Sequence, residues 1–491
     1  MKRLLTFYEE NRSIVLLCLV GFFLYAFFIL YRYIHFAYDD WDMAFLNQCL
    51  WNLSHGKLFS SLYGFNCFGD HSTFINLFAL PIFMLFPHPL TFSFIQIALF
   101  ISSVFLLYVI AKEGLGKLPA FIIALTYLVF PPNLFAMCHD CNPESLAPFF
   151  LLLAVYSYRK KNLGGYFVSI IFLFLIKENM PLIVGMLSLW GIFAQDRNRI
   201  KWGVVPLAIS FCYFLIAAKF IIPHFRGMEQ SSLWVRFSYL GSTPKDILHK
   251  LFQFRTLKGI FLLPANIDFL KELFGALLLP AILSPTVLSL ISPVIAYHLI
   301  SSHFPEKTIF YSYSLTMTPI IFLAAIQTLT KIKRWPSFHT LFCLFLLGAS
   351  LLNLYPHRGQ IKHKIGFDAN HYVNEKWSLV SMIPPNASVI TTFEFLPALS
   401  LRNNLYSIHK IYSKDYQEPD LIKLNVFNTG KPFKTPYNVQ YALINFDDTW
   451  IQDGLNNDPV YTEYKLDAFL KQWKEVAGAG PVKLYKRRTT Q

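Results

Sequence analysis

The feature that most limits the fold of this chain is an apolar run close to its N-terminus. Three basic residues precede the run, which extends from Ser13 to Tyr31 without a charged side chain. A helix of about 20 apolar residues crosses the roughly 30 Å of hydrocarbon in a bilayer. The bulky residues Tyr31, Arg32 and Tyr33 end the run, whereas a cleaved signal peptide ends in small residues. We therefore interpret the run as an uncleaved first transmembrane helix with its N-terminus in the cytoplasm.

The composition extends this interpretation to most of the chain. Hydrophobic residues make up 54% of the 491 residues and charged residues only 15%, against about 25% charged residues in ordinary soluble domains. A soluble globular fold would leave much of this apolar surface in water and is excluded. The net charge is +14. The basic residues lie in clusters between apolar runs, which is typical of a polytopic membrane protein and not of a nucleic-acid-binding one.

The basic clusters fall at every second turn between apolar runs and so predict a topology. Cytoplasmic loops are enriched in Lys and Arg, which places these residues on the inner side: Lys2, Arg3, Arg12, Lys112, Lys117, Arg159, Lys160, Lys161, Arg197, Arg199, Lys201, Lys331, Lys333 and Arg334. The alternation predicts about eleven spans within residues 1–355, a first extracytoplasmic loop at 34–75 and an extracytoplasmic C-terminus. The expected spans are 13–33, 90–111, 118–137, 145–158, 164–177, 180–195, 203–222, 268–283, 286–301, 309–330 and 337–355. The basic segment 223–267 is placed outside by this count.

Residues 356–491 have the charge density of a small soluble domain. They contain 17 basic and 13 acidic residues. Short buried strands are expected at 387–392, 441–446 and 482–485, and an amphipathic helix over 459–473. The predicted fold is therefore mostly α, a polytopic transmembrane helix bundle with a small C-terminal extracytoplasmic α/β domain.

The first extracytoplasmic loop carries the most informative group of charges. Asp39, Asp40 and Asp42 stand at the start of a predicted surface helix whose apolar residues repeat at spacings of three and four. Asp42 is placed to cap this helix and Gly56 to end it. The positive end of the helix dipole favours ionised carboxylates, which suits a general base or a cation ligand. Simple capping by solvated acids is equally compatible with these residue types.

Two further polar pairs lie beside apolar runs. Asp70 and His71 follow in the same loop, where a carboxylate beside an imidazole orients a proton shuttle or holds a metal. The residue types alone favour a simpler interfacial polar pair. Lys177 and Glu178 interrupt two short apolar runs, and charges within a membrane are usually functional or paired. Either Lys177 reaches the outer interface, or a re-entrant hairpin directs Glu178 into a cavity.

The cysteines and the common catalytic motifs give less information. The sequence Cys138-His-Asp-Cys141 is a single pair and weak evidence for a metal, so no metal ligand is assigned. Its outside placement permits a disulfide, as does that of Cys49 and Cys67. The chain has no phosphate-binding Gly-rich loop, no Gly-x-Ser-x-Gly elbow and no His-Glu-x-x-His sequence. ATP-driven transport and serine or zinc hydrolysis therefore have no local support.

Several short motifs resemble those of a bacterial family. They are the stretch from Asp42 to Gly56, Gly69-Asp-His71, Asn142-Pro-Glu-Ser-Leu-Ala-Pro148, Ile176-Lys-Glu178, Tyr311-Ser-Tyr313 and Ile383-Pro-Pro-Asn-Ala-Ser388. The chain thereby resembles the integral membrane proteins catalogued as domain of unknown function 2079. It departs from the family at Asn142 and Asn47, where the family often has His and Asp. His139 is a candidate to replace the missing His in space.

This family is similar in layout to the GT-C glycosyltransferases, which take a sugar from a polyprenyl-phosphate carrier on the outer membrane face. The resemblance implies a multi-pass protein of the bacterial inner membrane with a catalytic carboxylate among Asp39, Asp40 and Asp42. His71 and Glu178 are added as catalytic candidates from their own chemistry. It implies a lipid-linked sugar donor, membrane lipids and an unknown glycan, lipid or protein acceptor as partners, and leaves a divalent cation open as a cofactor. A departing phosphate needs cations, and the candidates are Lys177, Arg226, Arg236, Arg255 and Lys258. The last four are equally compatible with an ordinary basic surface near anionic lipid.

Two other classes of function stay open beside the sugar transferase. A transporter or lipid flippase would also be polytopic, although the two matched halves typical of secondary transporters are not visible in the sequence. A non-catalytic membrane anchor that presents the C-terminal domain would tolerate replacement of Asp42, His71 and Glu178. The sugar transferase is the leading hypothesis because the notable acids lie at outer helix ends.

Overall fold

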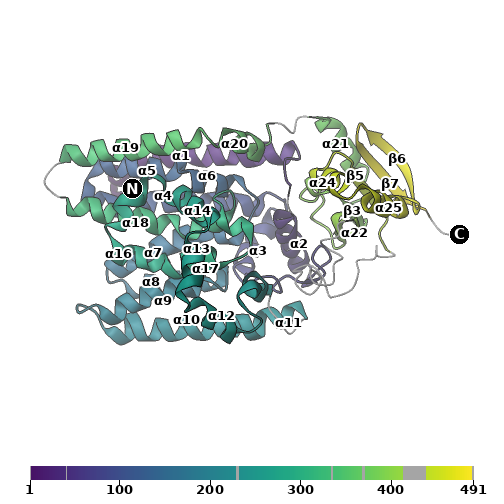
Figure 1. Cartoon of the computed structure of the whole chain (residues 1–491). Helices are drawn as coiled ribbons and strands as arrows, with labels where there is room; N and C mark the ends of the chain where they lie inside the picture. The colour runs from purple at the N-terminus through teal and green to yellow at the C-terminus, as the bar shows by residue number, and fades with distance from the viewer. Residues whose placement is uncertain are drawn as a thin grey trace.

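The computed structural model describes residues 2–39, 41–227, 232–332, 336–367, 371–412 and 438–488. A bundle of helices forms its larger part, and a small domain with a five-stranded sheet lies at one end of the bundle (Figure 1). The mostly helical fold predicted from the sequence is confirmed. The main helices of the bundle are α1 (Lys2–Ile34), α3 (Asn76–Leu85), α4 (Thr91–Leu115), α5 (Lys117–Val129), α6 (Pro131–Cys138), α7 (Ala147–Arg159), α8 (Leu163–Ile176), α9 (Met180–Phe193), α10 (Val205–Ile216), α11 (Ile222–Arg226), α14 (Pro264–Phe274), α15 (Leu278–Ile282), α16 (Pro285–Leu288), α17 (Ser292–Ile300), α18 (Thr318–Lys331), α19 (Pro336–Leu354) and α20 (Arg358–Ile365).

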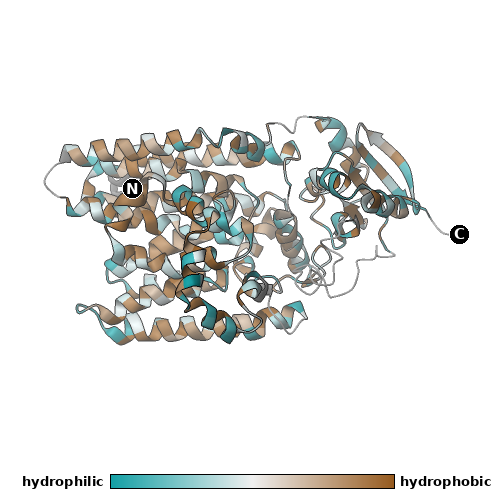
Figure 2. Cartoon of the chain, in the orientation of Figure 1, coloured by the Kyte–Doolittle hydropathy of each residue, from teal (hydrophilic) through white to brown (hydrophobic). Residues whose placement is uncertain are grey.

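Long apolar helices give the bundle its membrane character. Among the described residues, four helices are long and apolar enough to cross a membrane: Glu10–Ile34, Thr91–Leu115, Ile200–Arg226 and Ser337–Leu354. The pair α5 and α6, bent by 46° where two prolines begin α6, is a fifth candidate. Figure 2 shows brown, apolar residues along the outer helices of the bundle. Such faces suit hydrocarbon better than water.

The predicted number of eleven spans stays a prediction, because several of the expected spans are short helices. α7, α8 and α9 contain 13, 14 and 14 residues, fewer than the roughly 20 that cross a bilayer. They occur where the apolar runs 145–158, 164–177 and 180–195 predict helices. α3 is a helix of 10 residues that the sequence did not predict.

The C-terminal domain is built on a mixed sheet with the order β4-β3-β5-β7-β6, in which β3 is parallel to β4 and β5, and β7 is antiparallel to β5 and β6. The three predicted strands are confirmed as β3, β5 and β7. The sequence missed β4, which has three residues, and β6, whose side chains are mostly exposed. The elements are α21 (Val373–Ser381), β3 (Val389–Thr391), β4 (Leu405–Ser407), α22 (His409–Tyr412), β5 (Tyr441–Asn445), α24 (Thr449–Asn457), α25 (Pro459–Leu470), β6 (Trp473–Ala479) and β7 (Val482–Arg487).

The first loop is packed between the bundle and the C-terminal domain. Its helix α2 (Asp42–Ser54) crosses the end of the bundle that faces this domain (Figure 1). The helix ends as predicted before Gly56, whose φ of +71° favours glycine. Phe36 and Tyr63 of the loop are buried in one apolar cluster with Leu396 of the domain. The loop and the domain therefore share a core.

A buried amide ties the loop to the domain. Gln48 Nε2 donates to the backbone carbonyls of Arg402 and Asn403 at 3.2 Å each, and to Ser61 Oγ at 2.9 Å. Its Oε1 accepts from Ser60 Oγ at 2.6 Å. Both ends of the amide are thus satisfied, as a buried polar group requires.

We expect Gln48→Ala to lower the stability of the protein by about 1–3 kcal/mol, because it leaves buried partners unsatisfied. Thermal unfolding in detergent measures this loss. Gln440→Ala, which changes an exposed amide of the same domain, serves as the control and should melt like the unchanged protein. Equal melting of both variants would show that the loop does not depend on this contact.

Candidate active site

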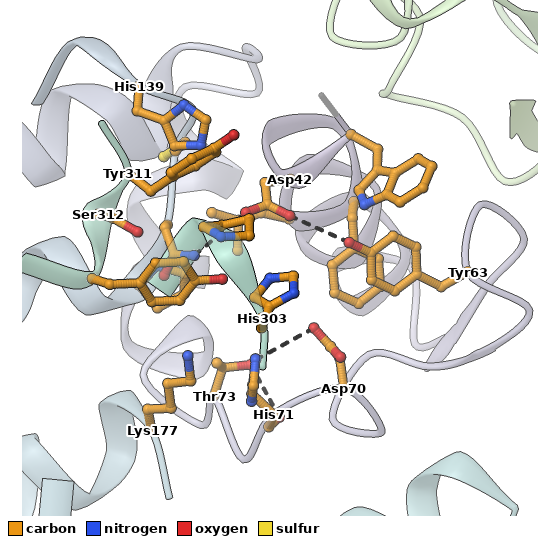
Figure 3. Close-up of a pocket in the computed structure, with 18 of the residues that line it drawn as sticks. Asp42, Tyr63, Asp70, His71, Thr73, His139, Lys177, His303, Tyr311 and Ser312 are labelled. Atoms are coloured by element: carbon orange, nitrogen blue, oxygen red, sulfur yellow. Dashed lines mark hydrogen bonds and ion pairs between the residues drawn. The ribbon is translucent and has the colours of Figure 1, made fainter. Parts of the chain in front are cut away.

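A cavity of about 420 Å³ lies where the first loop, segments that connect helices of the bundle and the C-terminal domain meet. Figure 3 shows side chains of the first loop and of the bundle, among them Asp42, His71 and Tyr311, around it. Aromatic rings of Phe45, Tyr63, Phe393 and Trp450 form part of its wall. Its ionisable lining residues are Asp39, Asp42, Tyr63, Asp70, His71, His139, Cys141, Lys177, Arg236, His303, Tyr311, Tyr313 and Lys364.

Asp42 begins α2 and lines this cavity. It does not cap the helix as predicted, because Trp41 holds the N-cap position and no side chain caps the helix. Instead, Tyr63 Oη donates to Asp42 Oδ1 at 3.3 Å, and Asn142 Nδ2 donates to Oδ2 at 3.5 Å. Burial and the neighbouring Asp70 carboxylate raise the pKa of Asp42 above its usual value. A carboxylate in this setting is suited to accept a proton.

His71 lies between two carboxylates. Its Nδ1 is 2.7 Å from Glu178 Oε1, and its Nε2 is 3.7 Å from Asp70 Oδ2. The backbone N–H of Ser72 donates to Glu178 Oε2 at 3.2 Å. Burial acts to raise the pKa of Glu178, but His71 and Lys177 lower it to about 2. Glu178 is therefore ionised and orients the imidazole from behind, while His71 itself lines the cavity.

Two cations of the lining are held by buried carboxylates. Lys177 Nζ is 3.0 Å from Glu144 Oε1, and the two side chains are only 7% and 2% exposed. Arg236 is paired with Glu306, whose Oε1 also accepts a hydrogen bond from Tyr297 Oη at 3.2 Å. Ammonium and guanidinium groups carry several N–H donors each. The carboxylates therefore hold both cations at the cavity wall, and each cation has more N–H donors than its carboxylate uses.

Asp39 and His139 form a second polar group around Lys364. Lys364 Nζ lies 4.0 Å from Asp39 Oδ1 and 3.0 Å from His139 Nδ1. Burial and the nearby charges of Lys364 and Arg32 lower the pKa of His139 well below its usual value, so the neutral ring accepts a hydrogen bond from the lysine. Asp40, the remaining acid of the predicted group, lies outside the described residues.

The three other basic residues predicted for phosphate binding are absent from the cavity lining. Arg226 is buried, and its guanidinium lies 5.0 Å from the centre of the Phe65 ring. Arg255 and Lys258 are exposed on α13 (Phe254–Phe261). The structure thus brings together Asp39, Asp42, His71, Lys177 and Arg236 of the predicted set, with Glu178 directly behind His71.

The sequence did not single out His303, which lines the cavity together with Arg236. Burial and the Arg236 charge lower the pKa of His303 to about 4, so its ring is neutral near pH 7. Lys177 Nζ lies 5.5 Å from the centre of the Tyr313 ring. Besides Lys177 and Arg236, the sequence signal for this part of the wall was the motif Tyr311-Ser-Tyr313, which carried the family resemblance.

The metal and disulfide candidates of the sequence can be compared with the described side chains. Among the described residues, no group of three or more His, Cys, Asp or Glu side chains is arranged to hold a metal ion. All seven cysteines are free, so the disulfides that the sequence permitted at Cys138 with Cys141 and at Cys49 with Cys67 are not formed in this structure. Cys141 lines the cavity and is buried.

Comparison with known proteins identifies the family. The model of a family described as "Predicted membrane protein (DUF2079)" matches residues 32–442. The chain belongs to this family. The match includes every described cavity residue from Asp39 to Phe393, and it agrees with the apolar helices in assigning this DUF2079 protein to a membrane. No curated protein matches the chain.

The solved structures that are similar to this DUF2079 protein include the following three. ArnT from Cupriavidus metallidurans in the apo state is 11% identical over 98% of both chains, with a TM-score of 0.49. ArnT from the same organism bound to undecaprenyl phosphate is 12% identical over 98% of this chain and 99% of that one, with a TM-score of 0.47. The apo oligosaccharyltransferase of Archaeoglobus fulgidus is 11% identical over 98% of this chain and 75% of that one, with a TM-score of 0.49.

We expect Lys177→Met to destabilise the protein by about 3–5 kcal/mol, because it leaves the Glu144 carboxylate buried without its partner. Thermal unfolding in detergent measures the effect. Lys160→Met is the matched control, since it removes an ion pair with Glu113 that is half exposed on both sides, and it should change the melting temperature little. Combining Lys177→Met with Glu144→Gln should recover part of the loss. Equal melting of the two single variants would contradict the structural importance of the buried pair.

Proposed function

We propose that this protein is a membrane glycosyltransferase that moves a sugar from a polyprenyl-phosphate donor to an acceptor on the extracytoplasmic face of the bacterial inner membrane. Residues 1–355 form its membrane domain and residues 356–491 its extracytoplasmic domain. The observation that carries the proposal is the Asp42 carboxylate, whose pKa is raised in a cavity that also holds two fixed cations. The GT-C layout implied by the sequence motifs supports the same reaction class.

Asp42 is the general base of the proposed reaction. A proton acceptor works best when its pKa approaches the working pH, and burial with the Asp70 charge moves Asp42 in that direction. Tyr63 and Asn142 each donate to one carboxylate oxygen, which holds the group in place. Asp42 takes the proton of the acceptor hydroxyl as the acceptor oxygen forms its bond to the anomeric carbon of the sugar.

Lys177 and Arg236 stabilise the leaving group. As the new bond forms, the bond from the anomeric carbon to the phosphate oxygen breaks, and its electron pair leaves with the polyprenyl phosphate. Fixed donors lower the barrier most when they face the place where charge develops. Both cations line the cavity that contains Asp42 and are held by buried carboxylates, so little reorganisation is needed during the reaction.

The position of the cavity suits an amphipathic donor. It lies at the end of an apolar bundle, so a lipid chain can stay among the helices while its phosphate and sugar enter the polar space. On the opposite side, Phe393 and Trp450 of the C-terminal domain complete the wall. Their rings offer the flat apolar surface on which a saccharide packs, and this domain is therefore the proposed acceptor side.

We expect Asp42→Asn to lower kcat by about 10²- to 10⁴-fold, the usual contribution of a positioned base. Donor affinity should change little, since the amide preserves the volume of the side chain. Turnover and binding are measured on the purified protein with a panel of polyprenyl-phosphate sugars, with and without divalent cations. Asp467→Asn, which changes an exposed aspartate of the C-terminal domain, should retain full activity.

Two outcomes would contradict this assignment. If Asp39→Asn loses activity while Asp42→Asn stays fully active, the base still belongs to the first loop but is not Asp42. Retained function of variants at Asp42, His71 and Glu178 would instead favour the transporter or the membrane anchor.

The pH dependence gives an independent test of the base. Because Asp42 must be ionised to act, activity should fall as the pH drops through its raised pKa. Asp70→Asn removes the like charge that contributes to this rise, so the acid limb of the kcat/KM profile should move to lower pH. Asp467→Asn should leave the limb in place. If the acid limb does not move in Asp70→Asn, ionisation of Asp42 is not what limits activity at low pH.

A further inference from the structure

A short helical arm on the flank of the bundle has no role in the proposed reaction. It comprises residues 244–263 and contains α12 (Pro244–Leu251), α13 and the two leucines that follow. The side chains of Ile247 and Ile260 are buried, and Leu251 packs against the main core. One face of this arm, which we call the α12–α13 arm, is thereby fixed to the protein.

The other face of the α12–α13 arm is strongly apolar and uncovered. Phe252 and Phe254, at the turn between the two helices, are 86% and 80% exposed. Leu248, Phe261, Leu262 and Leu263 are also exposed. An aromatic and leucine surface of this kind, next to a polar face, is typical of helices that lie in the interface of a membrane.

The charges of the arm identify the surface that it fits. Its basic side chains Lys245, Lys250, Arg255 and Lys258 are all exposed, and Asp246 is its single acidic residue. Lys250 interacts electrostatically with this Asp246, so the arm keeps an excess of exposed positive charge. Basic residues beside an apolar face attract anionic lipid headgroups, while long side chains keep their charges at headgroup level.

We propose that the α12–α13 arm is a membrane-surface anchor that inserts its phenylalanines and leucines at the edge of the hydrocarbon and binds anionic phospholipid headgroups through its four cations. The occupant of the face is thus the bilayer that surrounds the bundle, not a second protein. Arg255 and Lys258, predicted from the sequence to bind the substrate phosphate, act on lipid phosphates instead. The anchor does not depend on the proposed transferase activity.

The arm is connected to the cavity through a short stretch of chain. Residues 232–240 form a 3₁₀ helix that leads toward α12 and contains Arg236, whose backbone carbonyl accepts from the N–H of Ser302 at 2.8 Å. α13 packs against α17, the helix that precedes Ser302 and the cavity residue His303. Anchoring of the arm in lipid therefore holds this side of the cavity at the membrane surface.

Depth measurement in nanodiscs tests the insertion. In a Cys212→Ser background, which removes the exposed native cysteine, a fluorescent probe is attached at Phe254→Cys or, as a control, at Val460→Cys. Val460 is 79% exposed in the C-terminal domain. Lipids with a quencher on the acyl chain should quench the probe at 254 and spare the probe at 460. If both probes are equally unquenched, as expected for probes in water, the proposal is overturned and a protein partner is favoured.

Counting the bound lipids tests whether the cations of the arm bind anionic headgroups, with a second pair of variants. The double variant Arg255→Gln/Lys258→Gln is compared with Lys471→Gln/Lys474→Gln, which removes two exposed cations of the C-terminal domain. Native mass spectrometry after incubation with phosphatidylglycerol or phosphatidylcholine counts the retained lipids. We expect the first variant alone to lose phosphatidylglycerol, with no change for phosphatidylcholine. Equal retention of phosphatidylglycerol by both variants would contradict binding of anionic headgroups by the arm.

Discussion

The ion pair between Lys177 and Glu144 fixes the geometry on which the site depends. Both charges are buried at the end of apolar helices, where neither would be tolerated alone. Pairing them joins the break between α8 and α9 to the 3₁₀ turn that precedes α7, and Asn179 adds a hydrogen bond to the same carboxylate at 3.2 Å. The adjacent residue Glu178 then reaches His71. A single polar break in the bundle therefore holds both a cation and an oriented imidazole at the cavity.

The proposed base is positioned from the other side. Asp42 belongs to a loop whose apolar residues share a core with the C-terminal domain, and the Gln48 amide fastens this loop to that domain. The carboxylate and the cations consequently come from parts of the protein that are stabilised separately. Asn142 connects them, because it donates to Asp42 and lies two residues before Glu144. This arrangement permits a charged site between an apolar bundle and a polar domain.

The sequence predicted what depends on local pattern. Apolar runs predicted many of the bundle helices, short buried runs predicted three of the five strands, and the neighbouring acids of the first loop predicted a polar site. Partners distant in the chain could not be predicted, since nothing local relates Arg236 to Glu306 or Lys364 to His139. The capping role assigned to Asp42 was wrong because a local rule cannot detect Tyr63 and Asn142 as competing donors. For the same reason, the sequence could not show which basic residue of segment 223–267 lies at the cavity.

The most direct test of the account is a cryo-EM structure of the protein in nanodiscs with a polyprenyl-phosphate sugar bound. The account predicts the lipid phosphate beside Lys177 and Arg236, with the anomeric carbon of the sugar facing Asp42 and the lipid chain against the bundle. A phosphate bound elsewhere, with the cavity around Asp42 free of the sugar, would contradict it.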